Sequence, residues 1–199
     1  MHPKLPGEVR PAPRTNAERI AASRAALLDA AHALFVERGY AATSTPEISA
    51  AAGLTRGALY YHWADKADLL RAVLEREAEA VRHAIDAACA GVVKPEQALL
   101  RGVDAYLDAM AKRGRTRLLL VEAPAVLGSA ELQALDERHF APVLQQGLRA
   151  ALRRDTDFTT ALARLVSSAF DRAALDIAAG ADPAATRHAM RWLVKRLVG

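Results

Sequence analysis

The fold of this chain is decided by the stretch TSTPEISAAAGLTRGALYYHWADK, residues Thr43 to Lys66. The spacing of its apolar residues predicts two short helices, one over residues 45–52 and one over residues 56–63. Gly53 lies between them, where a chain that leaves a helix commonly needs a positive φ. Two short helices joined by a tight turn are the layout of a helix-turn-helix, whose second helix enters the major groove of DNA.

Local signals indicate where these helices begin. Ser44 and Glu47 form an S/T-x-x-E capping box, and Pro46 falls in the first turn, where its missing N–H costs little. Thr55 is a natural N-cap for the second helix. Leu54 follows the turn glycine, and we expect it to anchor the turn in the core.

The sequence before this unit predicts one long helix and an arm. A second capping box, Thr15 with Glu18, opens the helix, and Gly39 is a good stop signal for it. Residues 1–14 carry four prolines and three basic residues, so we expect a flexible basic arm there. A solvated tail is the simpler interpretation of the arm, and contact with DNA is the alternative.

The segment GLTRGALYYHWADKADLL, residues 53–70, resembles the DNA-reading segment of the TetR family of bacterial transcriptional regulators. The residues that carry this resemblance are Leu59, Tyr60, His62, Trp63 and Lys66. The resemblance is strong over roughly residues 27–74 and weak beyond. It implies an all-α protein with a three-helix DNA-binding domain, residues 15–64, and a helical effector-binding and dimerisation domain, residues 65–199.

The chemistry of the reading unit divides its residues into two roles. Several groups suit phosphate contacts: the hydroxyls of tyrosine, serine and threonine, the ammonium of Lys66, and the N-termini of helices. Phosphate contacts fix the register of the protein on DNA but carry no sequence information. Arg56, in the first turn of the second helix, could bind guanine bidentately. For Tyr60, Tyr61 and His62, packing inside the domain is the alternative. The expected DNA-binding residues are Thr43, Ser44, Thr45, Thr55, Arg56, Gly57, Ala58, Tyr60, Tyr61, His62 and Lys66.

One position departs from the family. Family members often place a long polar or basic side chain near the position of Pro46, and proline has no donor to offer a base. We therefore expect Arg56 to carry more of the specificity, or the N-terminal arm to contribute.

Composition agrees with a helical, intracellular DNA-binding protein without requiring one. Hydrophobic residues make up 52% of the 199 residues and aromatic residues only 5%, so the core must be mostly Ala, Leu and Val. The net charge of +4 permits nucleic-acid binding, but residues 1–66 carry eight basic against six acidic residues, which is weak evidence. The single cysteine, Cys89, excludes an internal disulfide framework. We expect a cytoplasmic, nucleoid-associated protein with no cofactor, no metal and no membrane segment.

The rest of the chain predicts six more helices. Their approximate ranges are 65–90, 95–111, 116–122, 129–152, 158–178 and a last helix from 183 onward. Ala123-Pro124 is expected to interrupt the third of these, and Pro142 to bend or break the fourth.

The family resemblance implies an effector pocket enclosed by the helices between residues 65 and 152. Few aromatics argue against a large stacking cage, so an apolar or mildly polar ligand is expected. Ordinary core or surface placement is the alternative for each candidate. The candidate ligand-binding residues are Tyr106, Met110, Glu122, His139 and Phe140.

The resemblance also implies that the last two helices pair with their copies in a four-helix dimer interface. Small residues in the helix over residues 158–178 suit close approach, and packing within one protomer is the alternative. The candidate interface residues are Leu162, Val166, Ala169, Phe170, Ala173, Met190, Leu193, Val194 and Leu197.

These features predict a homodimeric regulator, expected to be a repressor, that binds a palindromic double-stranded operator and is released by a small molecule. An all-helical enzyme is one alternative, but the six histidines show no H-x-x-x-H or H-E-x-x-H spacing, and no G-x-S-x-G or phosphate loop occurs. A DNA-binding protein without an effector is the other, and a solid core with no cavity would favour it.

Overall fold

The computed structural model describes residues 15–153 and 157–199, and the predicted arm over residues 1–14 lies outside them. Every regular element of the described residues is helical, which confirms the all-α prediction. Within those ranges, no helix combines the length and the apolar character that are needed to cross a membrane.

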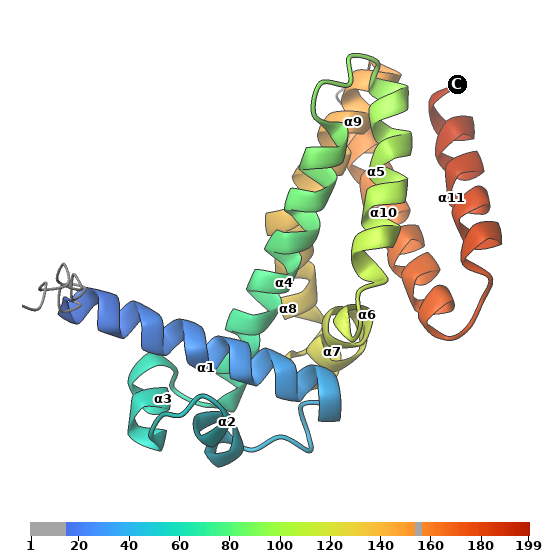
Figure 1. Ribbon diagram of the computed structural model, residues 1–199. Helices are drawn as coiled ribbons and strands as arrows, with labels where there is room; N and C mark the ends of the chain where they lie inside the picture. Colours follow the sequence, from blue (N-terminus) through green and yellow to red (C-terminus); the bar gives the residue numbers. More distant parts are fainter. Residues whose placement is uncertain (1–14, 154–156) are drawn as a thin grey trace, which may run out of the picture.

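Three helices form a head at one end of the molecule: α1 (Asn16–Arg38), α2 (Thr45–Ala51) and α3 (Arg56–His62). Figure 1 shows the long α1 lying across the two short helices. Both predicted capping boxes form, Thr15 with Glu18 and Ser44 with Glu47. Gly53 adopts the predicted positive φ of 66° between α2 and α3.

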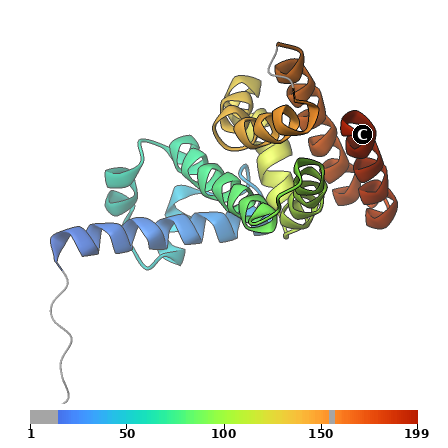
Figure 2. The ribbon, with the colours of Figure 1, turned by 90° about the horizontal axis from the view of Figure 1, so that it is seen from above.

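Helix α4 (Lys66–Cys89) leaves the head and runs along the whole body, where it packs against α5 (Pro95–Met110). Helices α10 (Asp157–Ala178) and α11 (Pro183–Val198) follow beside α5. In Figures 1 and 2, α11 lies at the edge of the molecule farthest from the head. The head and the α10–α11 pair therefore occupy opposite ends, with α4 and α5 between them.

The segment after α5 corrects one prediction. Ala123-Pro124 does not interrupt the chain: α6 (Arg115–Arg117), a π-helical turn η1 (Leu118–Glu122) and α7 (Ala123–Leu127) follow without a break. The amide of Ala123 bonds to the carbonyl of Leu118, five residues back. This wider turn directly precedes the proline, and π-bulges are a recognised way to insert an irregularity into a helix.

The prediction for Pro142 is confirmed, because the helical chain is broken at Phe140. Helix α8 (Ser129–His139) ends there, and α9 (Ala141–Leu152) begins with Pro142 in its first turn. Proline fits that position, since the first amides of a helix have no partner inside it.

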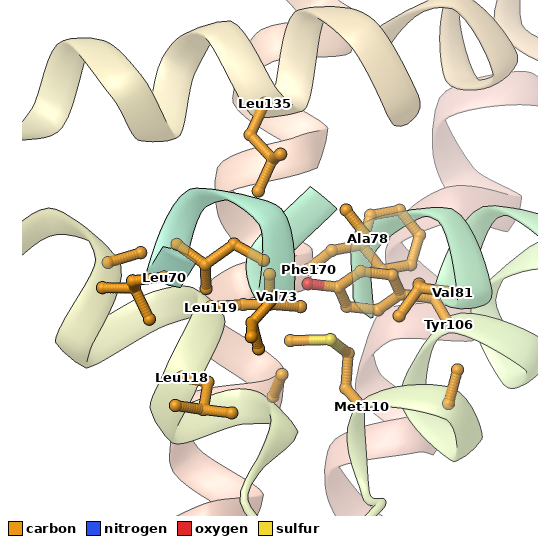
Figure 3. Packing of buried hydrophobic residues seen from close by; sticks show 14 of the residues in the cluster. Leu70, Val73, Ala78, Val81, Tyr106, Met110, Leu118, Leu119, Leu135 and Phe170 are labelled. Carbon is orange, nitrogen blue, oxygen red and sulfur yellow. The ribbon is translucent and has the colours of Figure 1, made fainter. Parts of the chain in front are cut away.

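One continuous core joins the head to the body. Its buried residues run from Leu27 in α1 through Leu70 and Val73 in α4 to Val194 in α11. Figure 3 shows part of it, where side chains of α4, α5, η1, α8 and α10 meet around Tyr106 and Met110. Helix α4 contributes to this core along most of its length, so it links the packing of the body to the head.

Polar contacts also tie the head to the body at the domain junction, which we define as Gly39, Tyr40, Arg117 and Glu122. The Glu122 carboxylate accepts the Tyr40 amide at 2.8 Å and pairs with Arg117 at 3.1 Å. Arg117 also donates to the carbonyls of Phe35 and Val36 at the end of α1. Gly39 has a φ of 86°, and a Cβ there would meet the Glu122 carboxylate at 3.0 Å.

Candidate functional site

The exposed face of the head is built around helix α3. Leu59 is fully buried and Trp63 is 4% exposed, so these two side chains fix α3 against the rest of the head. The opposite face presents Arg56 and Gly57, both exposed, from the first turn of the helix. A helix anchored on one face and open on the other is the arrangement in which base edges can be contacted.

Two tyrosines stand beside this face. Tyr61 is 71% exposed and Tyr60 45%. The Tyr60 hydroxyl lies 3.1 Å from the Thr45 hydroxyl. The pKa of Tyr60 is lowered by this hydrogen bond and by its interaction with Arg56. Tyr60 therefore joins the start of α2 to the start of α3 and leaves Tyr61 projecting from the surface.

A shallow hollow lies at the N-terminus of α2, lined by residues 41–46, Tyr60 and Lys66. The Lys66 ammonium donates to the carbonyls of Tyr40 and Thr43, at 2.9 and 2.8 Å, and lies 4.0 Å from the centre of the Tyr40 ring. Its charge is thereby held at the wall of the hollow. Helix N-termini favour anions, so a phosphate oxygen fits here.

Thr43 lies beneath the surface on which the sequence placed it. Its side chain is buried, with only 2% exposed, and its hydroxyl donates to the carbonyl of Gly39 at 2.8 Å. The hydroxyl closes the α1–α2 turn and does not reach the surface. Thr43 therefore positions the hollow through its carbonyl, which holds Lys66.

His62 also points away from the expected DNA surface. Its Nε2 atom lies 2.8 Å from the Ser23 hydroxyl on α1. Burial, followed by the nearby Arg24, lowers the pKa of His62, which favours the neutral ring. The imidazole thus braces α3 against α1, which is the alternative that the sequence left open.

The remaining hydroxyls of the set act as caps. The Thr55 hydroxyl accepts the Ala58 amide at 3.2 Å, and an accepting hydroxyl keeps its hydrogen for another acceptor. The Ser44 hydroxyl accepts the Glu47 amide at 3.4 Å and also donates to the Glu47 carboxylate at 2.6 Å, and this second bond lowers the pKa of the Glu47 carboxyl. Thr45 and Ala58 are half-buried at the edge of the face.

A cavity of about 440 Å³ lies in the body, between α4, α5, α9, α10 and α11. Two of the five candidate ligand residues, Tyr106 and Phe140, line it. Its wall includes α10, which the sequence had not assigned to the pocket, and it lacks the segment over residues 115–127. The lining of a cavity depends on which helices pack together, and a local sequence pattern does not predict that packing.

The other three candidates lie outside this cavity. Glu122 belongs to the domain junction, where it holds Tyr40 and Arg117. The Nε2 atom of His139 lies 2.6 Å from the Glu75 carboxylate. Met110 is 2% exposed and does not line this cavity, but it lines a second one of about 460 Å³ between the end of α5, residues 111–117 and α10.

The predicted dimer residues divide into two groups. Four are half-buried at the surface of α10 and α11: Leu162, Ala169, Leu193 and Leu197. Five are buried inside the protomer, where they pack against its own core: Val166, Phe170, Ala173, Met190 and Val194. Three large apolar side chains of the pair are exposed, and the sequence had not placed them in the interface: Phe158 at 59%, Leu165 at 70% and Trp192 at 56%.

Comparison with protein families places both halves of the chain. Residues 27–73 match the model of bacterial regulatory proteins of the tetR family. Residues 96–199 match the model of the tetracyclin repressor-like C-terminal domain. The second match covers the body from the start of α5 to the end of the chain.

Individual relatives agree with this placement. The structure is similar to a TetR-family transcriptional regulator from Pectobacterium atrosepticum, with 33% identity, 93% of this chain and 96% of that chain covered, and a TM-score of 0.72. The transcriptional repressor BepR of Brucella suis is 44% identical over 63 residues, which is 32% of this chain and 30% of BepR. The regulator TtgR of Pseudomonas putida is 40% identical over 62 residues, 31% of this chain and 30% of TtgR.

The match thus spans about 30% of the length of these two curated relatives. The similarity to the Pectobacterium protein, by contrast, extends over head and body together. With both family models and a nearly full-length structural relative, the chain belongs to the TetR family of bacterial regulatory proteins.

Proposed function

We propose that the protein is a homodimeric transcriptional regulator that represses genes by binding a palindromic operator and is released by a small molecule. The observation that carries this proposal is the exposed face of α3, with Arg56 and Gly57 open to solvent and the anchors Leu59 and Trp63 behind them. The named relatives are transcriptional regulators or repressors, which weighs against the enzyme alternative. The protein would act on DNA in the cytoplasm, at the nucleoid.

On the operator, the two sets of contacts would have different tasks. Thr45, Tyr60 and Lys66 line the hollow, and they suit phosphate oxygens, as does the exposed hydroxyl of Tyr61. Arg56 is an exposed planar donor in the first turn of α3, suited to the O6 and N7 atoms of guanine. Thr43 and His62 support this surface from below and are not proposed to touch DNA.

The dimer would form through α10 and α11. Leu165 and Trp192 are large apolar side chains that are mostly exposed on the protomer. Covering them against a second copy removes apolar surface from water, and a two-fold axis presents the same patch on both subunits. Two copies of α3 would then reach successive major grooves, which requires a separation of about 34 Å.

Release would follow from ligand binding in the cavity. The cavity is bordered by residues 85–90, near the end of α4 that is remote from the head. A ligand that prefers one placement of α4 changes the position of the head at the helix's other end. Such a ligand lowers operator affinity only if it binds better to the conformation that fits DNA poorly.

Binding to an operator selected from random DNA tests the proposal. Arg56→Ala is expected to cost about 1–3 kcal/mol and to relax the preference at one base pair of each half-site. The control is Arg101→Ala, which removes an exposed arginine of the body. Fluorescence anisotropy measures both. Equal affinities of the wild type and Arg56→Ala for the operator would remove Arg56 from the base contacts.

A further inference from the structure

We propose that the cavity binds an apolar molecule with a positively charged head group, and that the Asp171 carboxylate receives this charge. The inference deepens the proposed function by naming the chemical class of the effector, and in that respect it rests on it. Three observations carry it: the aromatic rings at one end of the cavity, the carboxylate beside them, and the signs of the charges in the wall.

Three aromatic rings gather at this end of the cavity. Tyr106 lies edge-to-face against Phe170, with centroids 5.2 Å apart, and against Phe140 at 6.3 Å. Figure 3 shows Tyr106 and Phe170 side by side. Two of the chain's four phenylalanines and one of its four tyrosines thus line one site. Aromatic faces attract cations, and quaternary ammonium groups above all.

The Asp171 carboxylate lines the same cavity and is bonded to one of these rings, without a basic partner among the described residues. Its Oδ1 atom accepts the Tyr106 hydroxyl at 2.7 Å. Among the described residues, no arginine, lysine or histidine forms an ion pair with it. A second carboxylate, Asp136, lies close enough to disfavour its ionisation further, and that group is bonded to Ser167 at 2.8 Å.

This environment makes the ionised carboxylate costly. Burial, with a smaller contribution from Asp136, raises the pKa of Asp171 to about 6, although the Tyr106 hydrogen bond acts in the opposite direction. A carboxylate that is removed from water and lacks a cation is destabilising. A ligand cation would supply the missing partner, so binding would recover the cost of burying the charge.

The charges in the wall exclude the opposite class of ligand. The charged residues that line the cavity within the described ranges are Asp86 and Asp171, with no lysine, arginine or histidine. A ligand carboxylate or phosphate would therefore meet only repulsion and desolvation. The rest of the wall is mostly apolar, with Ile85, Leu99 and Val143 among its side chains. The volume of about 440 Å³ leaves room for a hydrocarbon tail.

Three probes with the same tail separate the charge from the apolar contribution: decyltrimethylammonium, 1-decanol and decanoate. Binding of each to the full-length protein is measured by isothermal titration calorimetry below micelle formation. Wild-type protein is expected to bind decyltrimethylammonium roughly 10-fold or more tightly than 1-decanol, and decanoate weakest of the three.

Two carboxamide variants assign the effect. Asp171→Asn keeps the shape and the hydrogen bond to Tyr106, and should remove the preference for the cation while 1-decanol still binds. Asp86→Asn removes a charge from the same cavity, but Asp86 is exposed and already paired with Arg82 at 2.5 Å. The preference should persist in that control. Phe140→Leu, which removes one ring, should reduce the preference severalfold and serves if Asp171→Asn fails to fold.

Several results would overturn the proposal. They are tightest binding of decanoate, equal binding or no binding of all three probes by the wild type, and an unchanged cation preference in a folded Asp171→Asn variant. Operator binding is measured on the same preparations. Cation binding by a protein that binds no operator would refute the proposed function and leave the ligand class standing. Operator binding without any cation preference would refute the ligand class and leave the proposed function standing.

Discussion

At the scale of single residues, ionisation of the Asp171 carboxyl lowers the stability of the folded protein by an amount that unfolding measurements can detect. Its carboxyl has a pKa of about 6 in the folded protein against 3.8 in the reference state. Between these values the folded state holds a proton that the unfolded state has lost. Ionisation of Asp171 therefore does not lower the free energy of unfolding below pH 3.8. The loss of stability grows as the pH rises and reaches its full size above about 6.

Asp171→Asn is therefore expected to stabilise the protein at neutral pH. The gain is up to about 3 kcal/mol at pH 7.5, because the amide cannot ionise, and it should shrink towards zero as the pH approaches 4. Thermal unfolding at both pH values measures it, with Asp86→Asn as the control that removes an exposed charge. A gain of equal size at both pH values would show that ionisation of Asp171 is not its cause.

Glu122 is the second residue whose role can be isolated. Its carboxylate holds the Tyr40 amide and the Arg117 guanidinium at the domain junction, and its side chain is only 17% exposed. Glu122→Gln should destabilise the fold by about 1–3 kcal/mol, since charge-assisted hydrogen bonds at partly buried sites are lost.

The matched control is Glu131→Gln, which breaks an ion pair with Arg71 in which both side chains are more than 40% exposed. Exposed pairs are worth about 0–1 kcal/mol, so this variant should unfold almost as the wild type does. Urea denaturation compares the two variants. A Glu122→Gln variant as stable as the control would mean that the junction is held by packing alone.

At the scale of elements, α10 and α11 are apolar on two faces, and only the structure tells the faces apart. Val166 and Val194 point into the protomer, whereas Leu165 and Trp192 are exposed. The neighbouring residues 165 and 166 thus lie on opposite faces of α10, one exposed and one buried. Helical periodicity alone cannot decide which of the two apolar faces meets a partner.

Leu165→Glu and Trp192→Glu should each shift the protein from dimer to monomer at low micromolar concentration, since a buried unpaired carboxylate is costly in an interface. Val121→Glu is the control, because Val121 is 48% exposed on η1, outside the proposed interface. Sedimentation velocity gives the oligomeric state. If both variants stay dimeric as the control does, the interface lies elsewhere.

The helix boundaries of the head could be predicted because their signals are local. Two capping boxes and the positive φ of Gly53 each depend on residues within one or two turns. The π-helical turn over residues 118–122 could not, because the run LLLVE has no polar face whose spacing would report the wider turn. In the same way, Thr43 and His62 carry polar groups whose direction is set by Gly39 and Ser23, which are distant in sequence or across a helix boundary.

At the scale of the whole molecule, the fold was predictable and the ligand site was not. The alternation of apolar helices and breakers indicates an all-α body, but the cavity forms where five separate elements meet. The low aromatic content of 5% argued against a large stacking cage, yet the fold brings three rings together, those of Tyr106, Phe140 and Phe170. Composition averages over the chain, whereas a site depends on a few residues and their placement.

The distance between the two reading helices is the property of the dimer that operator binding senses. One protomer presents a single α3, and a second copy joined through α10 and α11, as we propose, would present another related by two-fold symmetry. The central claim is thus that sequence-specific DNA binding belongs to the dimer and is read by α3.

Selection of bound sequences from a pool of random double-stranded DNA tests that claim most directly. The wild-type protein is predicted to enrich a two-fold symmetric sequence whose half-sites lie about 10 base pairs apart, or a multiple of that spacing. Leu165→Glu should enrich it far less. Recovery of unrelated sequences after repeated rounds, or of a single half-site without symmetry, would contradict the account.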